Sequence, residues 1–392
     1  MCDEKTDASP APDWRVAVLD DIGRLDAAEW NRLGVAPYPF LRHEFLAALE
    51  RNGCLGEAWG WLPRHLTVRD AQGTLLAACP LYLKFNSYGE FVFDWSWADA
   101  YRRNGLEYYP KLVSASPYTP ATGPKLLLAP EAPPALRRLL MEAALELARA
   151  EGCSSVHWLF TPEEETDFLE QAGRLRRTGC QFHWHNHGWR DFDDFLASLS
   201  HAKRKNIRRE RRRAAEAGIE FRLLDGHTAQ EADWADFHQL YESTFDRKGG
   251  IPTLSLGFFL ELAETLPEQV LLVQARHDGR NVAAAFNLVG EDCLYGRHWG
   301  CREHFHSLHF ETCYYQGLDF CLRRGLARFE PGAQGEHKVA RGFLPTPTWS
   351  AHWLADARFA RAVQQFLVHE TEGMQDYMDE MMAHSPYRRT DS

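Results

Sequence analysis

The chain has 392 residues and a formal net charge of −11 at pH 7, from 44 Lys and Arg against 55 Asp and Glu. Its 45% hydrophobic content is enough for buried cores and excludes general disorder. The acidic balance argues against a dedicated nucleic-acid-binding protein. The longest apolar run, 75–83, is about half as long as a membrane span, and the first residues do not resemble a signal peptide. We therefore expect a cytoplasmic protein without a membrane span.

The nine cysteines are an odd number and never form a Cys-x-x-Cys pair. In a chain of this length they are typical of reduced, mostly buried thiols. We expect neither a disulfide framework nor a cysteine-bound metal.

Two segments near the start of each half match each other in sequence. The first pair, 39–49 and 252–262, shares Pro39/Pro252, Leu41/Leu254, Phe45/Phe258 and Leu49/Leu262. The second pair, 70–78 and 276–284, shares Gly73/Gly279, Ala77/Ala283 and Ala78/Ala284. Each half then reads as helix, hairpin, longer strand, helix and short strand.

This repeat predicts two α/β domains of one topology, at 13–180 and about 185–370. Residues 1–12 are expected to be a disordered N-terminus, and 371–392 a helix end with a tail that is disordered from 385.

A basic segment opens the second half. Residues 191–217 keep a helical apolar stripe and precede Gly218, so we expect one helix there. Eight of the eleven residues in 203–213 are basic, on a protein that is otherwise acidic. One interpretation is a solvated helix face. The other is a surface for the phosphates of a nucleotide cofactor or RNA, with Lys203, Arg204, Lys205 and Arg208 as candidates.

Several further segments carry a family resemblance. They are 116–124 (SPYTPATGP), 181–186 (QFHWHN), 203–210 (KRKNIRRE), 310–317 (FETCYYQG) and 329–345, which contains EPGAQGEHK. Together they resemble the FemAB-like predicted N-acyltransferases, a family described as peptidoglycan biosynthesis or recognition proteins. The resemblance covers nearly the whole chain, and the EPGAQGEHK run is its most specific part.

The resemblance implies two tandem GNAT-type acyltransferase domains, each a mixed, mostly antiparallel sheet flanked by helices. It also implies transfer of an acyl or aminoacyl group, from acyl-CoA or from the aminoacyl-tRNA that Fem ligases use, to a small-molecule or peptide amine. No metal is expected. A non-catalytic, degenerate GNAT pair that binds a peptidoglycan-like or amine ligand is the alternative, and an RNA-binding adaptor is a third.

One departure from the GNAT pattern bears on the donor. The pyrophosphate-binding fingerprint, Gln/Arg-x-x-Gly-x-Gly/Ala, belongs between a long strand and the next helix. At that place the second half has 300–306, which contains no second or third glycine. This departure puts acetyl-CoA in doubt for the second half and leaves room for an aminoacyl-tRNA donor there.

In the first half, the loop 116–124 is a candidate binding element. Tyr118, Thr119 and Thr122 supply hydroxyls, and Gly123 lets a ligand approach the backbone. The alternative is an ordinary Pro-Gly turn that closes two strands.

In the second half, the helix around Phe310 should turn Glu311, Tyr315 and Gln316 away from the core. These residues could line a pocket, with Tyr315 as a general acid, or be ordinary surface residues. Arg297 and Trp299 on the preceding strand, and His309 beside the helix, complete the candidate donor and substrate contacts.

The segment 330–341 combines glycines with titratable groups and is the strongest candidate site. Glu336 or His337 could accept the proton of an amine, while Lys338 and Arg341 could hold an anion. The alternative is an ion-pair network that pins the C-terminal region.

Three histidines alternate at His183, His185 and His187. On a strand they would share one face, where three imidazoles could bind a divalent metal. No carboxylate or cysteine stands at a helpful spacing, so whether they bind metal stays open.

Overall fold

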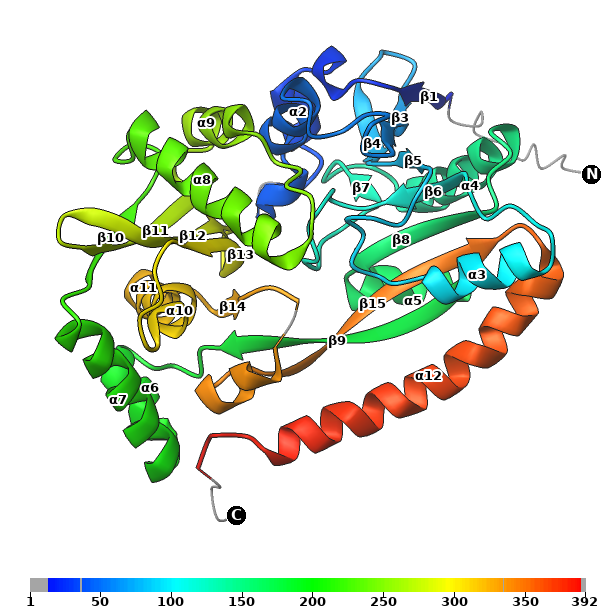
Figure 1. The fold of residues 1–392 in the computed structure, drawn as a ribbon. Coiled ribbons are helices and arrows are strands. Elements are labelled where there is room, and N and C mark those ends of the chain that lie inside the picture. Colours follow the sequence, from blue (N-terminus) through cyan, green and yellow to red (C-terminus); the bar gives the residue numbers. More distant parts are fainter. Residues whose placement is uncertain (1–12, 36, 334, 389–392) are drawn as a thin grey trace, which may run out of the picture.

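The structure is a computed structural model that describes residues 13–35, 37–333 and 335–388. It is a mixed α/β protein in which helices flank two mostly antiparallel sheets (Figure 1). The first-half strands are β1 (Arg15–Leu19), β2 (Trp61–Pro63), β3 (His65–Arg69), β4 (Leu75–Cys79), β5 (Tyr82–Lys84), β6 (Lys111–Ser114), β7 (Leu127–Leu128), β8 (Ser155–Thr161) and β9 (Leu175–His185). The later strands are β10 (Glu220–Leu224), β11 (Val270–His277), β12 (Arg280–Val289), β13 (Cys293–Cys301), β14 (Arg328–Glu330) and β15 (Leu344–Leu354).

Helices connect these strands in both halves. In the first half they are η1 (Ile22–Arg24), α1 (Ala27–Asn31), η2 (Pro39–Leu41), α2 (His43–Arg51), α3 (Trp95–Arg103), α4 (Ala135–Ala150) and α5 (Glu163–Gln171). In the second they are α6 (Phe192–Ser198), α7 (His201–Glu216), α8 (Glu231–Lys248), α9 (Leu256–Thr265), α10 (Leu308–Phe310), η3 (Glu311–Tyr315), α11 (Gln316–Arg324), η4 (Glu336–Arg341) and α12 (Ala357–Ala383). Among the described helices, none is long and apolar enough to cross a membrane.

The predicted order of element types, helix, hairpin, strand, helix and strand, is found in both halves, but in the first half the strand after the hairpin, β6, has four residues and is not the longer strand that was expected. Helix α2, the β3–β4 hairpin, β6, α4 and β8 correspond to α9, the β11–β12 hairpin, β13, α11 and β14. In each half the last two strands of this series pair in parallel across the intervening helix. This arrangement confirms the expected GNAT-type fold class.

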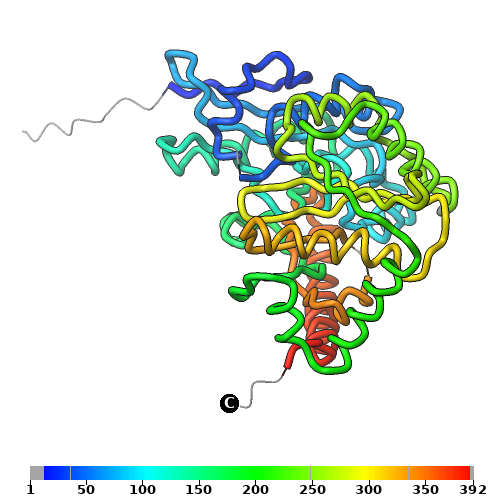
Figure 2. The backbone as a smooth tube through the Cα atoms, turned by 90° about the vertical axis from the view of Figure 1, so that its left-hand side faces the viewer, coloured from blue at the N-terminus to red at the C-terminus, as the bar shows by residue number. Residues whose placement is uncertain are grey.

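The two halves meet through matching elements. Helices α2 and α9 pack together, and the rings of Phe45 and Phe258, which occupy equivalent positions, have centroids 5.6 Å apart. Contact between equivalent residues is what a twofold relationship produces. The largest hydrophobic core contains residues of both halves, so the halves share one interior. Figure 2 shows the blue N-terminal part and the green and yellow second part side by side.

One strand crosses between the halves. The last strand, β15, lies between β8 and β9 and pairs antiparallel with both, while β9 also pairs with β14. An eleven-stranded sheet therefore runs through both halves, in the order β10-β11-β12-β13-β14-β9-β15-β8-β6-β5-β2. The predicted domain limits stay a prediction, because this sheet has no break between them.

Two expectations about local structure are wrong. The helix predicted over 191–217 is broken at Leu199 and Ser200, because the Ser200 amide donates to Pro386 and Leu199 bridges to Tyr387. The same contacts order residues 385–388, where a disordered tail was expected. The Tyr387 ring stacks on Trp189, and its hydroxyl donates to the Gly342 carbonyl over 2.7 Å. The expected disorder of 1–12 lies outside the described residues.

The described cysteines are all free thiols, and most are buried, as expected. The less expected feature of the interior is a charged cluster under the β5–α3 connection. Lys111 is fully buried, and its ammonium contacts Glu90 over 2.8 Å and Asp94 over 2.5 Å. Burial raises the pKa of Glu90 to about 7, whereas Lys111 holds the pKa of Asp94 at about 2. The cluster fixes the loop 85–95 to the sheet.

We predict that Lys111→Met lowers the free energy of unfolding by about 3–5 kcal/mol, because two buried carboxylates lose their counter-charge. Urea unfolding measures the change, with the exposed Lys205→Met as the matched control. Equal stability of the two variants would contradict the role given to Lys111.

Candidate functional site

The candidate site lies where β13 and β14 separate. The two strands pair at 293–295 and 328–330, after which β13 continues along β12 while the chain leaves β14. Gly296 faces Pro331 so closely that a Cβ there would stand 3.1 Å from the Pro331 Cα. The separation exposes two faces of the sheet, and the predicted residues of both halves gather around them.

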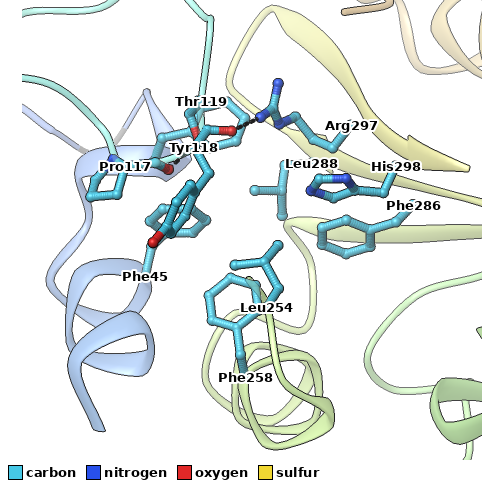
Figure 3. Close-up of a pocket in the computed structure, with 11 residues that line it drawn as sticks. Phe45, Pro117, Tyr118, Thr119, Leu254, Phe258, Phe286, Leu288, Arg297 and His298 are labelled. Atoms are coloured by element: carbon cyan, nitrogen blue, oxygen red, sulfur yellow. Dashed lines mark hydrogen bonds between the residues drawn. The ribbon is translucent and has the colours of Figure 1, made fainter. Parts of the chain in front are cut away.

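On one face, Arg297 of β13 contacts the predicted loop of the first half. Its guanidinium donates a hydrogen bond to the Tyr118 carbonyl (Figure 3). It also lies 5.4 Å from the centre of the Phe40 ring. Burial lowers the pKa of Arg297 to about 10. Tyr118 has a positive φ of 57°, and the neighbouring Thr119 hydroxyl donates to Pro117 over 3.0 Å. The cavity between them is about 10 Å³, no more than a water molecule needs.

The rest of the 116–124 loop is packed against its own half. Gly123 lies against the Tyr38 ring, where a Cβ would be only 2.5 Å from a ring carbon, and Thr122 is half-buried. The Lys125 ammonium donates to the carbonyls of Gly123 and Phe160, which fills the space where β6 and β8 separate. The binding role of Thr122 and Gly123 stays a prediction. In the first half, the position equivalent to the β13–β14 separation is closed.

Glu330 is the titratable group at the separation of β13 and β14. It is 4% exposed, and one carboxylate oxygen forms an ion pair with Arg328, 3.1 Å from its Nε. The other oxygen lies 3.9 Å from the His183 Nε2 and accepts no hydrogen bond from the part of the chain that the structure describes. Burial raises the pKa of Glu330 to about 7. The sequence analysis named Glu336 or His337 as the base and not Glu330; the signal for Glu330 was its place at the end of a strand, before Pro-Gly.

The neighbouring strand β9 connects Glu330 with the first-half loop. The Gln181 amide donates to the Pro120 carbonyl over 2.7 Å, and its oxygen is 3.1 Å from the His183 Nε2. The expectation that three histidines share a strand face is wrong for His187, because β9 ends at His185. Burial holds the pKa of His183 well below its usual range. Within the described ranges, no three His, Cys, Asp or Glu side chains are grouped so as to hold a metal ion.

A cleft of about 230 Å³ begins beside Gln181. Its floor is formed by β9 and β15, including Thr348 and Ser350, and its walls include Phe160 and Ala333. At the far end, Arg177 makes a bidentate ion pair with Glu370 of α12, over 2.7 and 2.8 Å. The cleft therefore lies between elements of both halves. Glu330 does not line it; the connection runs from Gln181 through His183, whose Nε2 is 3.1 Å from the Gln181 oxygen and 3.9 Å from Glu330.

On the other face, the π-helical turn η3 changes the expected orientation of its residues. Glu311, Tyr315 and Gln316 are buried, although an α-helix would have turned them outward. The extra residue in a π turn rotates the following side chains, and such turns are frequent at functional sites. Glu311 accepts from Gln316 over 2.8 Å and from Arg211 over 3.2 Å. The prediction that these residues face away from the core is therefore wrong.

A second buried carboxylate, Glu210 of α7, joins the predicted residues of this face. It accepts hydrogen bonds from the Tyr315 hydroxyl and, over 2.8 Å, from Arg341. The Arg341 guanidinium also lies 3.4 Å from the centre of the Phe310 ring. Burial raises the pKa of Tyr315 well above its usual range. Glu210 was not predicted, and it ties η3, η4 and α7 together.

Lys338 lies between the two faces. Its ammonium donates to the Gly332 carbonyl over 2.6 Å, and burial lowers its pKa to about 7. The Nε2 of the adjacent His337 forms a hydrogen bond with the Tyr314 hydroxyl over 2.9 Å. Glu336 is exposed and accepts from Tyr377 of α12. The catalytic roles of Glu336, His337 and Tyr315 stay predictions.

The remaining second-half candidates form an aromatic group next to Lys338. The rings of Trp299 and His309 have centroids 5.0 Å apart, and His309 also contacts Tyr314 and His337. The structure thus brings together the predicted residues of 297–341, but leaves Glu336 at the periphery.

The basic helix α7 turns most of its charge to solvent. Lys205 and Arg208 are exposed, whereas Lys203 and Arg204 are half-buried. Arg208 has a weak partner in Asp193 at 3.5 Å; no ion pair involves the other three among the described residues. Arg211 alone points inward, to Glu311 and the Phe192 ring.

Solved structures show the same fold at low sequence identity. FemX matches with a TM-score of 0.55 and 11% identity, over 87% of this chain and 98% of that one. The C-terminal domain of a putative lysylphosphatidylglycerol synthetase from Agrobacterium fabrum matches with a TM-score of 0.52 and 11% identity, over 86% and 95%. A search of curated proteins finds no match in sequence.

A family model described as FemAB-like, peptidoglycan biosynthesis/recognition, matches residues 21–389. This range includes every strand of the described chain except β1, the whole cleft and every residue of the site. The chain therefore belongs to the FemAB-like family.

Proposed function

We propose that the protein is an acyltransferase that moves an acyl or aminoacyl group from an activated donor to an amine, in cell-wall or amino-compound metabolism. The observation that carries the proposal is Glu330, a buried carboxyl with a pKa of about 7 where β13 and β14 separate. A base is most effective when its pKa lies near the working pH. Membership of the FemAB-like family and the FemX-like fold support the same class of reaction.

The reaction requires one proton to move from the amine to the leaving group. The amine nitrogen attacks the carbonyl carbon, the new C–N bond forms, and the C–S or C–O bond of the donor breaks. In this proposal Glu330 accepts the amine proton. Lys338, whose lowered pKa of about 7 lets it give up a proton near neutrality, protonates the leaving group.

The exposed charge of α7 favours an aminoacyl-tRNA over acyl-CoA as the donor. A solvated row of cations is the electrostatic footprint of a phosphate backbone. Helix α7 contacts η3 and η4, and Ala333 of the segment before η4 lines the cleft, so a bound tRNA would lie near Lys338. The acceptor amine would occupy the cleft beside Gln181.

We predict that Glu330→Gln lowers kcat/KM at least a hundredfold, since proton transfer contributes roughly 10²–10⁴ to such rates. Single-turnover transfer to an amine acceptor measures the loss. Glu336→Gln is the parallel variant: if Glu336 is the base instead, that variant will be the inactive one. In the wild type, the rate should peak near pH 7 and fall on both sides, because Glu330 is protonated at lower pH and Lys338 loses its proton at higher pH.

The same substitution should stabilise the protein at alkaline pH. The pKa of Glu330 is raised on folding from 4.5 to about 7, so its contribution to stability is present at low pH and is lost as pH rises between these values. One pKa unit corresponds to roughly 1.4 kcal/mol. The free energy of unfolding of Glu330→Gln, taken relative to the wild type at the same pH, should therefore be about 3 kcal/mol higher at pH 8 than at pH 4. Urea unfolding at both pH values tests this; an equal effect at both would show that Glu330 titrates normally.

The tRNA donor is tested by removing charge from α7. Replacing Lys203, Arg204, Lys205 and Arg208 by Ala should weaken tRNA binding and flatten its dependence on salt by about one unit of slope per phosphate contact. Replacing four basic residues elsewhere (Arg15, Arg24, Arg102 and Arg103) is the control of equal charge. Equal binding by both variants, together with stabilisation by acyl-CoA, would favour a thioester donor.

A binding protein without catalysis is the second candidate. In the first half, Lys125 fills the position equivalent to the β13–β14 separation, and this supports a role in binding without catalysis for the first half alone. The second candidate predicts that ligands stabilise the protein but that no donor is consumed, and that Glu330→Gln leaves ligand affinity unchanged.

A further inference from the structure

The connection from β5 to the first residue of α3, residues 85–95 (Figure 1), carries five exposed aromatic side chains and is called the loop 85–95 below. The exposed fractions are 50% for Phe85, 69% for Tyr88, 39% for Phe91, 57% for Phe93 and 43% for Trp95. The other exposed large hydrophobic residues of the described chain are spread over three places: β1, the loop between α8 and α9, and α12. Single exposed apolar residues are normal, but a concentrated group marks an interaction surface.

Buried groups hold this loop in place from below. The Lys84 ammonium lies 3.8 Å from the Trp61 ring centre and donates to the Tyr88 carbonyl over 3.1 Å. The Trp61 indole donates to the same carbonyl. Lys111 holds Glu90 and Asp94. The loop is therefore anchored by its backbone and its buried side chains, and the exposed rings contribute little to that anchoring.

The outer side of the loop carries no charge. Glu90 and Asp94, the acidic residues of 85–95, are both buried against Lys111, and the segment contains no basic residue. Placing this surface in a lipid headgroup region would thus desolvate no charged side chain. Phe, Tyr and Trp are also the residues that proteins place at membrane–water interfaces.

The aromatic surface is continuous with the cleft. Phe91, Val92 and Phe93 line the same cleft as Gln181, whereas Phe85 and Tyr88 do not. The Tyr88 and Trp95 rings contact each other, with centroids 5.3 Å apart. A molecule held at this surface is therefore at the mouth of the cleft.

We propose that the loop 85–95 docks the protein onto the surface of a lipid bilayer. The docking is argued from the features of the loop alone. Its consequence, that the cleft opens toward the bilayer and takes a substrate from it, rests on the proposed function. Because the contact is apolar and the protein has a net charge of −11, binding favours uncharged headgroups and persists at high salt.

The test is co-sedimentation of the full chain with phosphatidylcholine vesicles. Phe85→Ser/Tyr88→Ser removes two outer rings and should weaken vesicle binding at least roughly tenfold, from the apolar area lost. Phe366→Ser/Val368→Ser on α12 is the matched control, because these residues are similarly exposed, at 45% and 55%. Tyr88→Ser alone is the second variant if the double variant unfolds.

Three results would overturn the proposal: no vesicle binding by the wild type, equal binding by the loop and control variants, or binding that salt abolishes. Capture of a protein partner by the loop, without vesicle binding, would also overturn it. Turnover of a water-soluble acceptor is assayed in parallel. Its absence in the wild type contradicts the proposed function but leaves the vesicle result intact.

Discussion

The position of β15 is the constraint on which the candidate site depends. This strand pairs with β8 of the first half and with β9, which in turn pairs with β14 of the second. It forms the cleft floor with β9, and it holds η4, immediately before it, against α7 and η3. Lys338 and Arg341 therefore occupy fixed positions because the strand after them is locked between two others.

Burial of charge is the second feature that organises the site. Glu330, Lys338 and Arg297 all have pKa values shifted toward neutrality, and in each case burial is the largest cause. Elsewhere the chain compensates its buried charges with close partners, as Lys111 does for Glu90 and Asp94. At Glu330 the compensation is incomplete, since one oxygen accepts no hydrogen bond within the described residues. Groups left in this state are suited to proton transfer.

The two halves share a fold but use it differently. Where β6 and β8 separate, Lys125 and Gly123 fill the space, and the first half contributes the 116–124 loop as a wall for Arg297. Where β13 and β14 separate, the polar groups remain grouped around Glu330 and Lys338. The same divergence of parallel strands thus gives a packed wall in one half and a candidate reaction centre in the other.

The sequence by itself determined the two α/β halves and their matching elements, because apolar periodicity and turn residues are local signals. The family resemblance of its motifs added the GNAT-type fold class and most of the segments that meet at the site. The sequence did not reveal the place of β15, the break at Leu199 or the inward turn of Tyr315. Each of these depends on a partner far along the chain: β8 and β9 for β15, Pro386 and Tyr387 for the break, and Glu210 for Tyr315. Glu330 was passed over for Glu336 for the same reason. Only the tertiary structure decides which carboxylate is buried, because desolvation comes from neighbours that the local sequence does not name.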